Sequence, residues 1–386
     1  MNRASLDEFA ARKLESLARR NLRRELSITD RFGPTRVRND GDELISFACN
    51  DYLGLSHHEQ VVSASLEATR RYGVGAGASR LISGNHPLYL QLERQLADIK
   101  GTQDAVVFGS GYLTNIGVVP VLAGPPDLIL IDELCHSCLL TGAQLSRATV
   151  QAFRHNDLEH LAGLLERQRG AHRRCLLLTD GVFSMEGDLA PLAELSQLAD
   201  RHDAWLMSDD AHGLGVVGAG RGSTFAGPAP ASVPLQMGTL SKAVGAYGGY
   251  LCASRAVTAL IRNRARSLVF STGLPPGTLA AASAALRIIA ADPTLVETPL
   301  RRARLFTSTM HLAPAQSPIV PVLLESAERA VAESKRLRAR GFMVPAIRPP
   351  TVPPGTSRLR IAFSAAHSET DVLRLAEAVA TLRESA

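Results

Sequence analysis

Lysine is rare in this chain, and one lysine stands in an unusual setting. Only four of the 42 Lys and Arg residues are lysines. Lys242 lies in a small-residue segment, and no Asp or Glu occurs from 211 to 291. A lone amine in a carboxylate-free, glycine-rich setting loses its proton more easily and can act as a nucleophile. The other three, Lys13, Lys100 and Lys335, fit the alternative of a structural surface lysine.

Two carboxylates and a histidine follow a predicted strand at 205–207. Asp209 and Asp210 come at the carboxyl end of this strand, where α/β sheets bind their ligands. Strand alternation directs the two carboxylates to opposite faces, so one of them is expected to face a site. A turn or helix cap is the alternative, and it is weakened by His212, three residues after Asp209.

Three further segments carry groups suited to one chemistry. Phe108-Gly-Ser-Gly-Tyr112 is typical of a strand, a glycine turn and a helix N-terminus, which together expose N–H groups to a phosphate. His136 and Ser184 each follow another predicted strand. A single His in such a turn is more often structural than functional, so these two residues gain weight only beside the others.

Pyridoxal phosphate (PLP) is the cofactor that uses all of these groups. Its aldehyde forms a Schiff base with a lysine, and an acid keeps its pyridine nitrogen protonated. A backbone cradle holds its phosphate, and a flat side chain stacks on its ring. The absence of acids around Lys242 fits this cofactor, because carboxylates there would repel a phosphate dianion.

Short apolar strands alternate with helices from about 85 to 290. This pattern predicts a largely parallel sheet buried on both faces, in a three-layer α/β fold. We expect an N-terminal helical arm over 1–45, a large PLP-binding domain over 46–290 and a small C-terminal α+β domain over 291–386. The predicted strands are 44–48, 105–108, 127–131, 148–153, 175–179, 205–207, 319–324 and 357–363, and the predicted helices are 6–26, 88–99, 158–167, 192–202, 327–340 and 370–383.

The composition excludes several classes of protein. There is no run of about 18 apolar residues and no signal-peptide core, so we expect a cytoplasmic protein without a membrane span. A net charge of +5 with only 5% aromatic residues favours a small anionic partner over nucleic acid. The five cysteines suggest reduced thiols, and Cys135-x-x-Cys138 lacks the second ligand pair of a structural zinc site, so no metal is expected.

One motif is rejected as a decoy. Residues 213–218 match the Gly-x-Gly-x-x-Gly dinucleotide fingerprint after a strand. They run into Ala-Gly-Arg-Gly, which starts a helix poorly, and no acid follows to bind a ribose.

As an ordered set, the motifs resemble the α-oxoamine synthases, which are fold-type I PLP enzymes, over almost the whole chain. The segments 50–55 and 348–353 look most like the members that join L-alanine to a pimeloyl thioester of CoA or acyl carrier protein. Ala76 and Ala78 stand where relatives often have Gly or Ser. The motifs are Asn50-Asp-Tyr-Leu-Gly-Leu55, Gly73-Val-Gly-Ala-Gly-Ala-Ser-Arg80, Ile82-Ser-Gly84, 179–187, Asp209-Asp-Ala-His212, Thr239-Leu-Ser-Lys242 and 348–360.

The resemblance implies roles for particular residues. Lys242 would carry the cofactor and later move the Cα proton of the substrate, Asp209 would pair with the pyridinium nitrogen, and His136 would stack on the ring. The other implied contacts are His212 and Ser184 near the phenolic oxygen, Gly111 and Tyr112 at the cofactor, Thr239 at its phosphate, Ser271 and Thr272 from the neighbouring subunit of a homodimer, and Thr351 with Arg23 (or the adjacent Arg24) at the substrate.

Three alternatives stay open. A sister member of the family would run the same chemistry on glycine or serine. A non-catalytic member would keep the fold as a binding module, although it would not need Lys242. A thiol-redox protein would use Cys135 and Cys138 instead.

Overall fold

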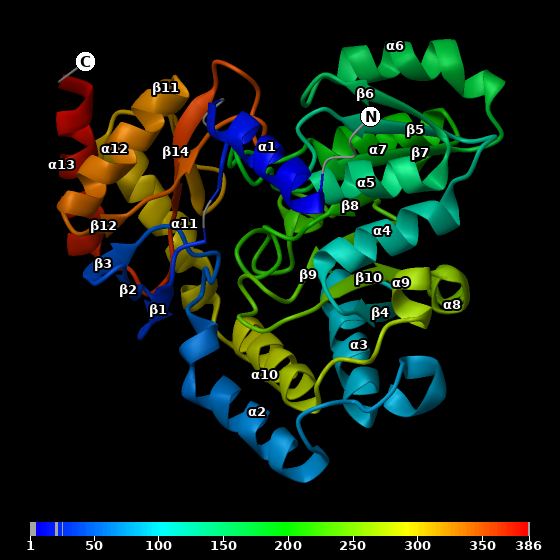
Figure 1. Cartoon of the computed structure of the whole chain (residues 1–386). Helices are drawn as coiled ribbons and strands as arrows, with labels where there is room; N and C mark the ends of the chain where they lie inside the picture. Colours follow the sequence, from blue (N-terminus) through cyan, green and yellow to red (C-terminus); the bar gives the residue numbers. More distant parts are fainter. Residues whose placement is uncertain (1–4, 20–21, 25, 385–386) are drawn as a thin grey trace.

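The computed structural model describes residues 5–19, 22–24 and 26–384. Its larger part is built on a seven-stranded sheet, with neighbours in the order β4-β10-β9-β8-β7-β5-β6 (Figure 1). All neighbours from β9 to β6 are parallel, whereas β10 is antiparallel to both β4 and β9. The predicted mostly parallel α/β fold is confirmed. The strands are β4 (Asp104–Phe108), β5 (Leu128–Asp132), β6 (Thr149–Phe153), β7 (Cys175–Asp180), β8 (Trp205–Asp209), β9 (Leu235–Thr239) and β10 (Gly249–Ala253).

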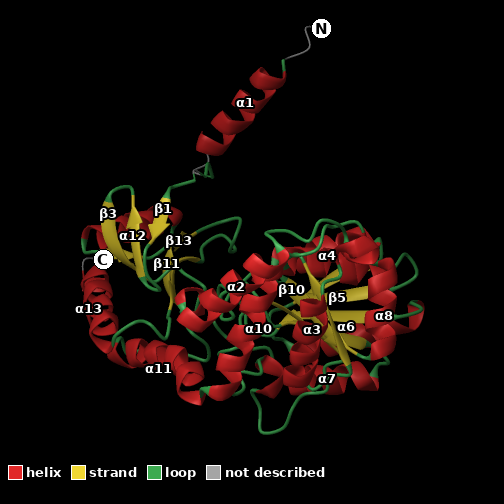
Figure 2. Ribbon diagram, turned by 90° about the horizontal axis from the view of Figure 1, so that it is seen from below, coloured by secondary structure: helices red, strands yellow, loops and turns green. Residues whose placement is uncertain are grey.

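Alternation along the strands buries apolar side chains on both faces of the sheet. In β5, Leu128 and Leu130 pack in one hydrophobic cluster, and Ile129 and Ile131 pack in another on the opposite face. Helices therefore cover both faces and complete three layers (Figure 2). One face carries α4 (Gly111–Leu122), α5 (Ser137–Ser146) and α8 (Arg255–Arg264), and the other carries α3 (Pro87–Lys100), α6 (Leu158–Gln168), α7 (Leu192–Arg201) and α10 (Pro276–Ala291), with α2 (Glu59–Tyr72) against α10.

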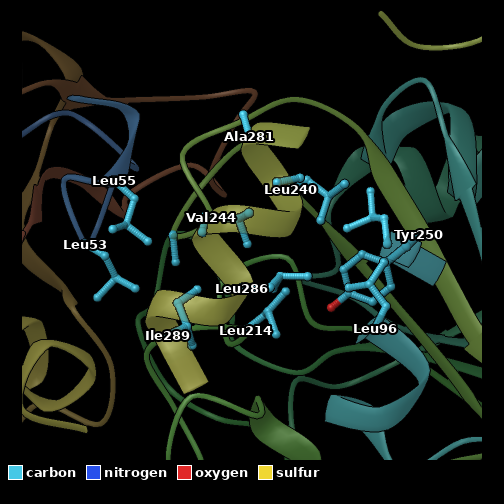
Figure 3. Packing of buried hydrophobic residues seen from close by; sticks show 14 of the residues in the cluster. Leu53, Leu55, Leu96, Leu214, Leu240, Val244, Tyr250, Ala281, Leu286 and Ile289 are labelled. Atoms are coloured by element: carbon cyan, nitrogen blue, oxygen red, sulfur yellow. The ribbon is translucent and has the colours of Figure 1, made fainter. Parts of the chain in front are cut away.

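The loop that carries Lys242 is anchored in this core. Leu240 and Val244, two residues to either side, are fully buried. They belong to the same hydrophobic cluster as Leu286 and Ile289 of α10 (Figure 3). Burial of such side chains stabilises the fold by about 1.5–3 kcal/mol each. The lysine backbone is thus fixed relative to the sheet.

The C-terminal part holds two small sheets. One has the order β11-β14-β13, and the other has the order β1-β2-β3-β12. Because Phe342 pairs with Ile45, strands from before residue 46 join the C-terminal part. These elements are β1 (Thr29–Arg31), β2 (Arg36–Asn39), β3 (Asp42–Ser46), β11 (Ile319–Glu325), β12 (Phe342–Met343), β13 (Ala346–Ile347) and β14 (Ser357–Ala362), with helices α11 (Pro293–Thr309), α12 (Ala327–Ala339) and α13 (Glu369–Glu384).

The N-terminal region differs from the helical arm expected over 1–45. It is helical over α1 (Leu6–Arg19), which has no buried residue and projects from the rest of the chain (Figure 2). The strands that follow are three to five residues long, too short to show a clear period in the sequence. The division of the remaining chain at 46–290 and 291–386 stays a prediction.

A bend separates the last helix of the larger part from the first long helix of the C-terminal part. Asp292 ends α10 and caps α11 by accepting from the backbone N–H of Leu295, and Pro293 opens α11. The two helices meet at 83°. Along the described chain, no single helix is long and apolar enough to cross a membrane, and only this bent pair passes such a test by length and composition.

Lys100 corrects one expectation. The sequence suggested a surface lysine before a helix-ending glycine, and Gly101 does end α3 in a left-handed conformation. The lysine side chain, however, is buried, and its Nζ lies 2.6 Å from Oδ2 of Asp210. The ammonium also donates to the carbonyl of Arg221. Its partner lies 110 residues away, which the local sequence cannot show.

We predict that Lys100→Met destabilises the protein by about 3–5 kcal/mol, because it leaves the Asp210 carboxylate buried without its partner. Urea unfolding of the two proteins measures the difference. Lys335→Met, at an exposed position, serves as the control and should change stability by less than about 0.5 kcal/mol. Equal stability of Lys100→Met and the parent would contradict a stabilising role for the pair.

Candidate active site

A cavity of about 220 Å³ lies at the carboxyl ends of the parallel strands. This is the edge at which sheets of this kind bind their ligands. Its walls come from the turn after β4, the start of α5, the ends of β7 and β8, and the loop after β9. The lining residues are Ser110, Gly111, Tyr112, His136, Cys138, Asp180, Asp209, Ala211, His212, Met237, Thr239, Ser241 and Lys242.

Lys242 reaches this cavity from the loop after β9. Its Nζ lies 2.6 Å from Nε2 of His212. Burial lowers the pKa of the Lys242 amine to about 8, although the negative charge of Asp209 acts in the opposite direction. At neutral pH the neutral fraction of this amine is therefore far larger than that of an ordinary lysine.

His212 links the amine to a buried tyrosine. Burial, and then the charge of Lys242, lower the pKa of His212 well below its usual value, so its imidazole is neutral. Its Nδ1 lies 2.6 Å from the hydroxyl of Tyr52, and Arg360 donates to that hydroxyl at 3.4 Å. A neutral imidazole has one N–H and one acceptor nitrogen. His212 can therefore donate to the Lys242 amine when Tyr52 donates to Nδ1, and can accept from it in the reverse arrangement.

Asp209 is the carboxylate that alternation brings to the cavity, as predicted, while Asp210 points to Lys100. Oδ2 of Asp209 accepts from Nδ2 of Asn115 at 2.7 Å, and Oδ1 accepts from the backbone N–H of Ala211 at 3.0 Å. The side chain is almost fully buried. Because these two hydrogen bonds hold the Asp209 carboxylate in place, its position suits a contact with a cationic ring nitrogen.

His136 caps α5 on the opposite wall. Its Nδ1 accepts from the backbone N–H of Cys138, and its own backbone N–H donates to Oδ1 of Asp180 at 3.2 Å. Burial lowers the pKa of His136, which leaves a neutral ring. Burial, and then the charge of Asp209, raise the pKa of Asp180 well above its usual range.

The N-terminus of α4, where the sequence predicts a phosphate cradle, lies at the cavity. Ser110 is its N-cap and accepts from the backbone N–H of Leu113. A Cβ at Gly111 would come within 3.3 Å of Met237 Cε, so the backbone approaches the cavity closely there. Thr239 and Ser241 add hydroxyls that lie 2.8 Å apart. Free N–H groups at a helix start attract a phosphate.

Five predicted site residues lie away from this cavity. The structure places Thr351 beside Arg24, whose Nη2 donates to the threonine hydroxyl at 3.1 Å, so Arg24 rather than Arg23 is the arginine that this threonine contacts. Ser184 faces Arg360, whose Nε donates to the serine carbonyl at 2.5 Å. Ser271 and Thr272 follow α9 (Arg266–Val269) and do not line the cavity of this chain.

Three residues at or beside the cavity were given no site role from the sequence. Asn115 belongs to no motif, Asp180 lies in the motif 179–187 without an assigned role, and Cys138 was weighed only as part of the C-x-x-C pair; all three contact other residues of the site. Asn115 lies four residues after Gly111, one helical turn along α4. This spacing places the two residues on the same side of the helix, and it was the sequence signal for Asn115. Tyr52 and Arg360 were part of recognised motifs, but nothing in the sequence brought them to His212.

The thiols of the C-x-x-C pair are poorly suited to redox chemistry. Cys135 and Cys138 are both free. Burial raises the pKa of Cys138 to about 12 and that of Cys135 well above its usual value. Because the thiolate is the reactive form, neither group is activated.

Comparisons with known proteins agree with this geometry. Residues 42–379 match the family model for aminotransferase class I and II. The chain is 56% identical over 379 residues to the 8-amino-7-oxononanoate synthase of Beijerinckia indica subsp. indica, covering 98% of each, and 60% identical over 343 residues to that of Methylocella silvestris, covering 89% of this chain and 98% of the relative. A serine palmitoyltransferase from S. paucimobilis, solved with PLP and myriocin bound, superposes with a TM-score of 0.91 at 28% identity, covering 99% of each chain.

The chain therefore belongs to the aminotransferase class I and II family, and within that family to the α-oxoamine synthases that these relatives represent. The predicted resemblance is confirmed.

We predict that Lys242 of the cofactor-free protein titrates near pH 8. A pulse of acetic anhydride at a series of pH values, followed by peptide mass spectrometry, measures how much amine is neutral. Exposed Lys335 is the internal reference for the reaction. In Asp209→Asn the Lys242 midpoint should fall further, because the charge that favours the ammonium is gone. A wild-type midpoint like that of Lys335 would contradict the assignment.

Proposed function

We propose that this protein is an 8-amino-7-oxononanoate synthase. It condenses L-alanine with a pimeloyl thioester of CoA or acyl carrier protein, and releases 8-amino-7-oxononanoate, CO2 and the free thiol, in biotin biosynthesis and in the cytoplasm. The observation that carries the proposal is the Lys242 amine, 2.6 Å from neutral His212 in the cavity that Asp209 also lines. The named relatives at 56–60% identity support the choice of reaction.

The residues of the cavity fit pyridoxal phosphate. Lys242 supplies an amine of lowered pKa for covalent attachment, and Asp209 supplies an anion for the ring nitrogen. The start of α4 at Gly111 and the hydroxyl of Thr239 supply a phosphate cradle. His136 supplies a flat neutral ring, Tyr112 joins the same wall, and His212 lies next to the point of attachment.

When bound, the cofactor supplies an electron sink for the carbon next to the amino group of the substrate. Asp209 would hold the ring nitrogen protonated, because its carboxylate is buried and fixed by Asn115 and Ala211. The chain would thereby place an anion at the ring nitrogen.

Lys242 and His212 carry out the proton transfers. A neutral Lys242 amine removes the Cα proton of the substrate and later returns it. His212 can donate to or accept from Nζ, depending on the direction of the hydrogen bond with Tyr52. The pair can thus hold the amine in either protonation state.

A permanent cation favours an amino-acid substrate. Arg360 is nearly buried, and its charge is felt at the cavity, since it lowers the pKa of both Lys242 and His212. Such a guanidinium attracts a carboxylate. The substrate would meet Thr351, Arg23 or the adjacent Arg24, which donates to the Thr351 hydroxyl, and His136 from the cavity side.

The working unit is a homodimer with shared active sites. Ser271 and Thr272 are partly exposed and stand outside their own cavity, as expected of residues that contact the phosphate of the neighbouring subunit. Apolar Phe270, next to them, is 72% exposed and would be covered by a partner.

A second candidate is a sister α-oxoamine synthase. The superposition with a serine palmitoyltransferase favours this class, which also includes 5-aminolevulinate synthase and 2-amino-3-ketobutyrate CoA ligase. The distinction lies in the amino acid and the acyl thioester.

We predict that the PLP-loaded protein converts L-alanine and pimeloyl-CoA to 8-amino-7-oxononanoate, identified by mass. Glycine and L-serine, each tested with acetyl-, succinyl- and palmitoyl-CoA, should react far more slowly. Lys242→Ala should form no product with any pair. Preference for serine with palmitoyl-CoA, or for glycine with a short-chain thioester, would instead identify the protein as a sister α-oxoamine synthase.

We predict that Asp209→Asn lowers kcat by about a hundredfold or more, because an amide cannot stabilise the positive ring nitrogen. Single-turnover rates with L-alanine measure the loss, and the PLP content of each preparation is checked first. Turnover within a few fold of the parent at equal PLP content would count against this role.

A further inference from the structure

Asn115 forms hydrogen bonds with two residues that line the cavity, Asp209 and Cys138. It is fully buried in α4, and its Nδ2 lies 2.7 Å from Oδ2 of Asp209 and 3.0 Å from Sγ of Cys138. An ionised carboxylate only accepts hydrogen bonds, so the amide nitrogen, and not the amide oxygen, must face Asp209. The orientation of the amide is therefore fixed by the carboxylate.

This orientation sets the direction of the next bonds. The second N–H of Asn115 points to Sγ of Cys138, which leaves the thiol proton for another acceptor. Nδ1 of His136 lies 2.7 Å from that sulfur and also accepts the backbone N–H of Cys138 at 3.3 Å. With two donors directed at Nδ1, the proton of the neutral ring must sit on Nε2.

The Asn115 amide carries an energetic penalty. Oδ1 of Asn115 is buried and has no hydrogen-bond partner among the described residues. An unpaired buried acceptor destabilises a protein, and an apolar side chain of similar volume would avoid this. The two N–H donors are what an apolar residue could not supply.

We propose that Asn115 and Cys138 are positioning residues: Asn115 holds the Asp209 carboxylate, and through Cys138 it holds His136 as the Nε2–H tautomer. The inference deepens the proposed function, on which it rests, because Asp209 and His136 matter as contacts of PLP. Neither Asn115 nor the thiol needs to react. The chain Asp209–Asn115–Cys138–His136 links the Asp209 carboxylate to the His136 imidazole, the two groups that would contact the cofactor ring.

Four variants test the proposal. Cys138→Ala removes the thiol donor, and Cys138→Ser restores an O–H donor. Asn115→Leu removes both amide donors at similar volume. Cys135→Ala is the matched control, since this thiol lies 3.6 Å from the carbonyl of Leu178 and lines no part of the cavity. Thermal unfolding of each variant shows whether it is folded.

The first readout needs no cofactor. In cofactor-free protein labelled with ¹⁵N-histidine, with the His136 signals identified by their loss in His136→Gln, we expect the Nε2–H tautomer. It should persist in Cys138→Ser and Cys135→Ala, whereas in Cys138→Ala, where the backbone N–H alone still donates to Nδ1, the share of the Nδ1–H tautomer should rise. An Nδ1–H tautomer in the parent protein, or no change in Cys138→Ala, would overturn the inference.

The second readout is PLP binding and turnover. Asn115→Leu should weaken PLP binding by about tenfold or more, as expected for the loss of a charge-assisted hydrogen bond. Cys138→Ala should lower kcat by about two- to tenfold at an unchanged KM for L-alanine, with rescue by Cys138→Ser. Variants that match Cys135→Ala while the parent binds PLP would refute the positioning roles alone, whereas a parent that does not bind PLP would refute the proposed function.

Discussion

The withdrawal of the Lys242 amine from water is the constraint on which the site depends. Burial disfavours the ammonium, while the charge of Asp209 favours it, and the balance is a pKa of about 8. That balance needs a fixed geometry, because a side chain free to reach solvent would regain its ordinary pKa. Leu240 and Val244 supply the anchor, since both are buried in the cluster that contains α10. The hydrophobic core and the chemistry of the amine are thus linked through one short loop.

The parallel sheet explains why the other groups converge on the same point. The cavity residues come from the segments that follow β4, β5, β7, β8 and β9, which end at one edge of the sheet. Asp209 and Asp210 show how alternation gives neighbouring residues different contacts. The Asp209 carboxylate faces the cavity. The Asp210 carboxylate pairs with buried Lys100 and accepts from the backbone N–H of Ser223. Arg360 of β14 reaches Asn50 and Tyr52, so the C-terminal part completes the surroundings of His212.

The sequence could predict the elements whose signals are local. Five of the seven strands of the large sheet (β4 to β8) and the glycine turn before α4 follow from period, composition and spacing, whereas β9 and β10 were not among the predicted strands. It could not predict contacts between distant segments. Lys100 was expected at the surface because its helix and glycine suggested only a C-terminus, and Asp210 lies 110 residues away. Asn115 was passed over because its contacts with Cys138 and Asp209 join segments that lie 23 and 94 residues away. Strands β1 and β2 were missed because they are only three and four residues long, whereas β3 overlaps the strand predicted at 44–48.

Covalent attachment at one lysine tests the account most directly. The chain offers only four lysines, so the three others are internal controls. The PLP-loaded protein is reduced with borohydride, digested and analysed by peptide mass spectrometry. The account predicts that one reduced pyridoxyl phosphate group is found on Lys242, with Lys13, Lys100 and Lys335 unmodified. A colourless protein in which Lys242 keeps its free amine, or one modified elsewhere, would contradict it.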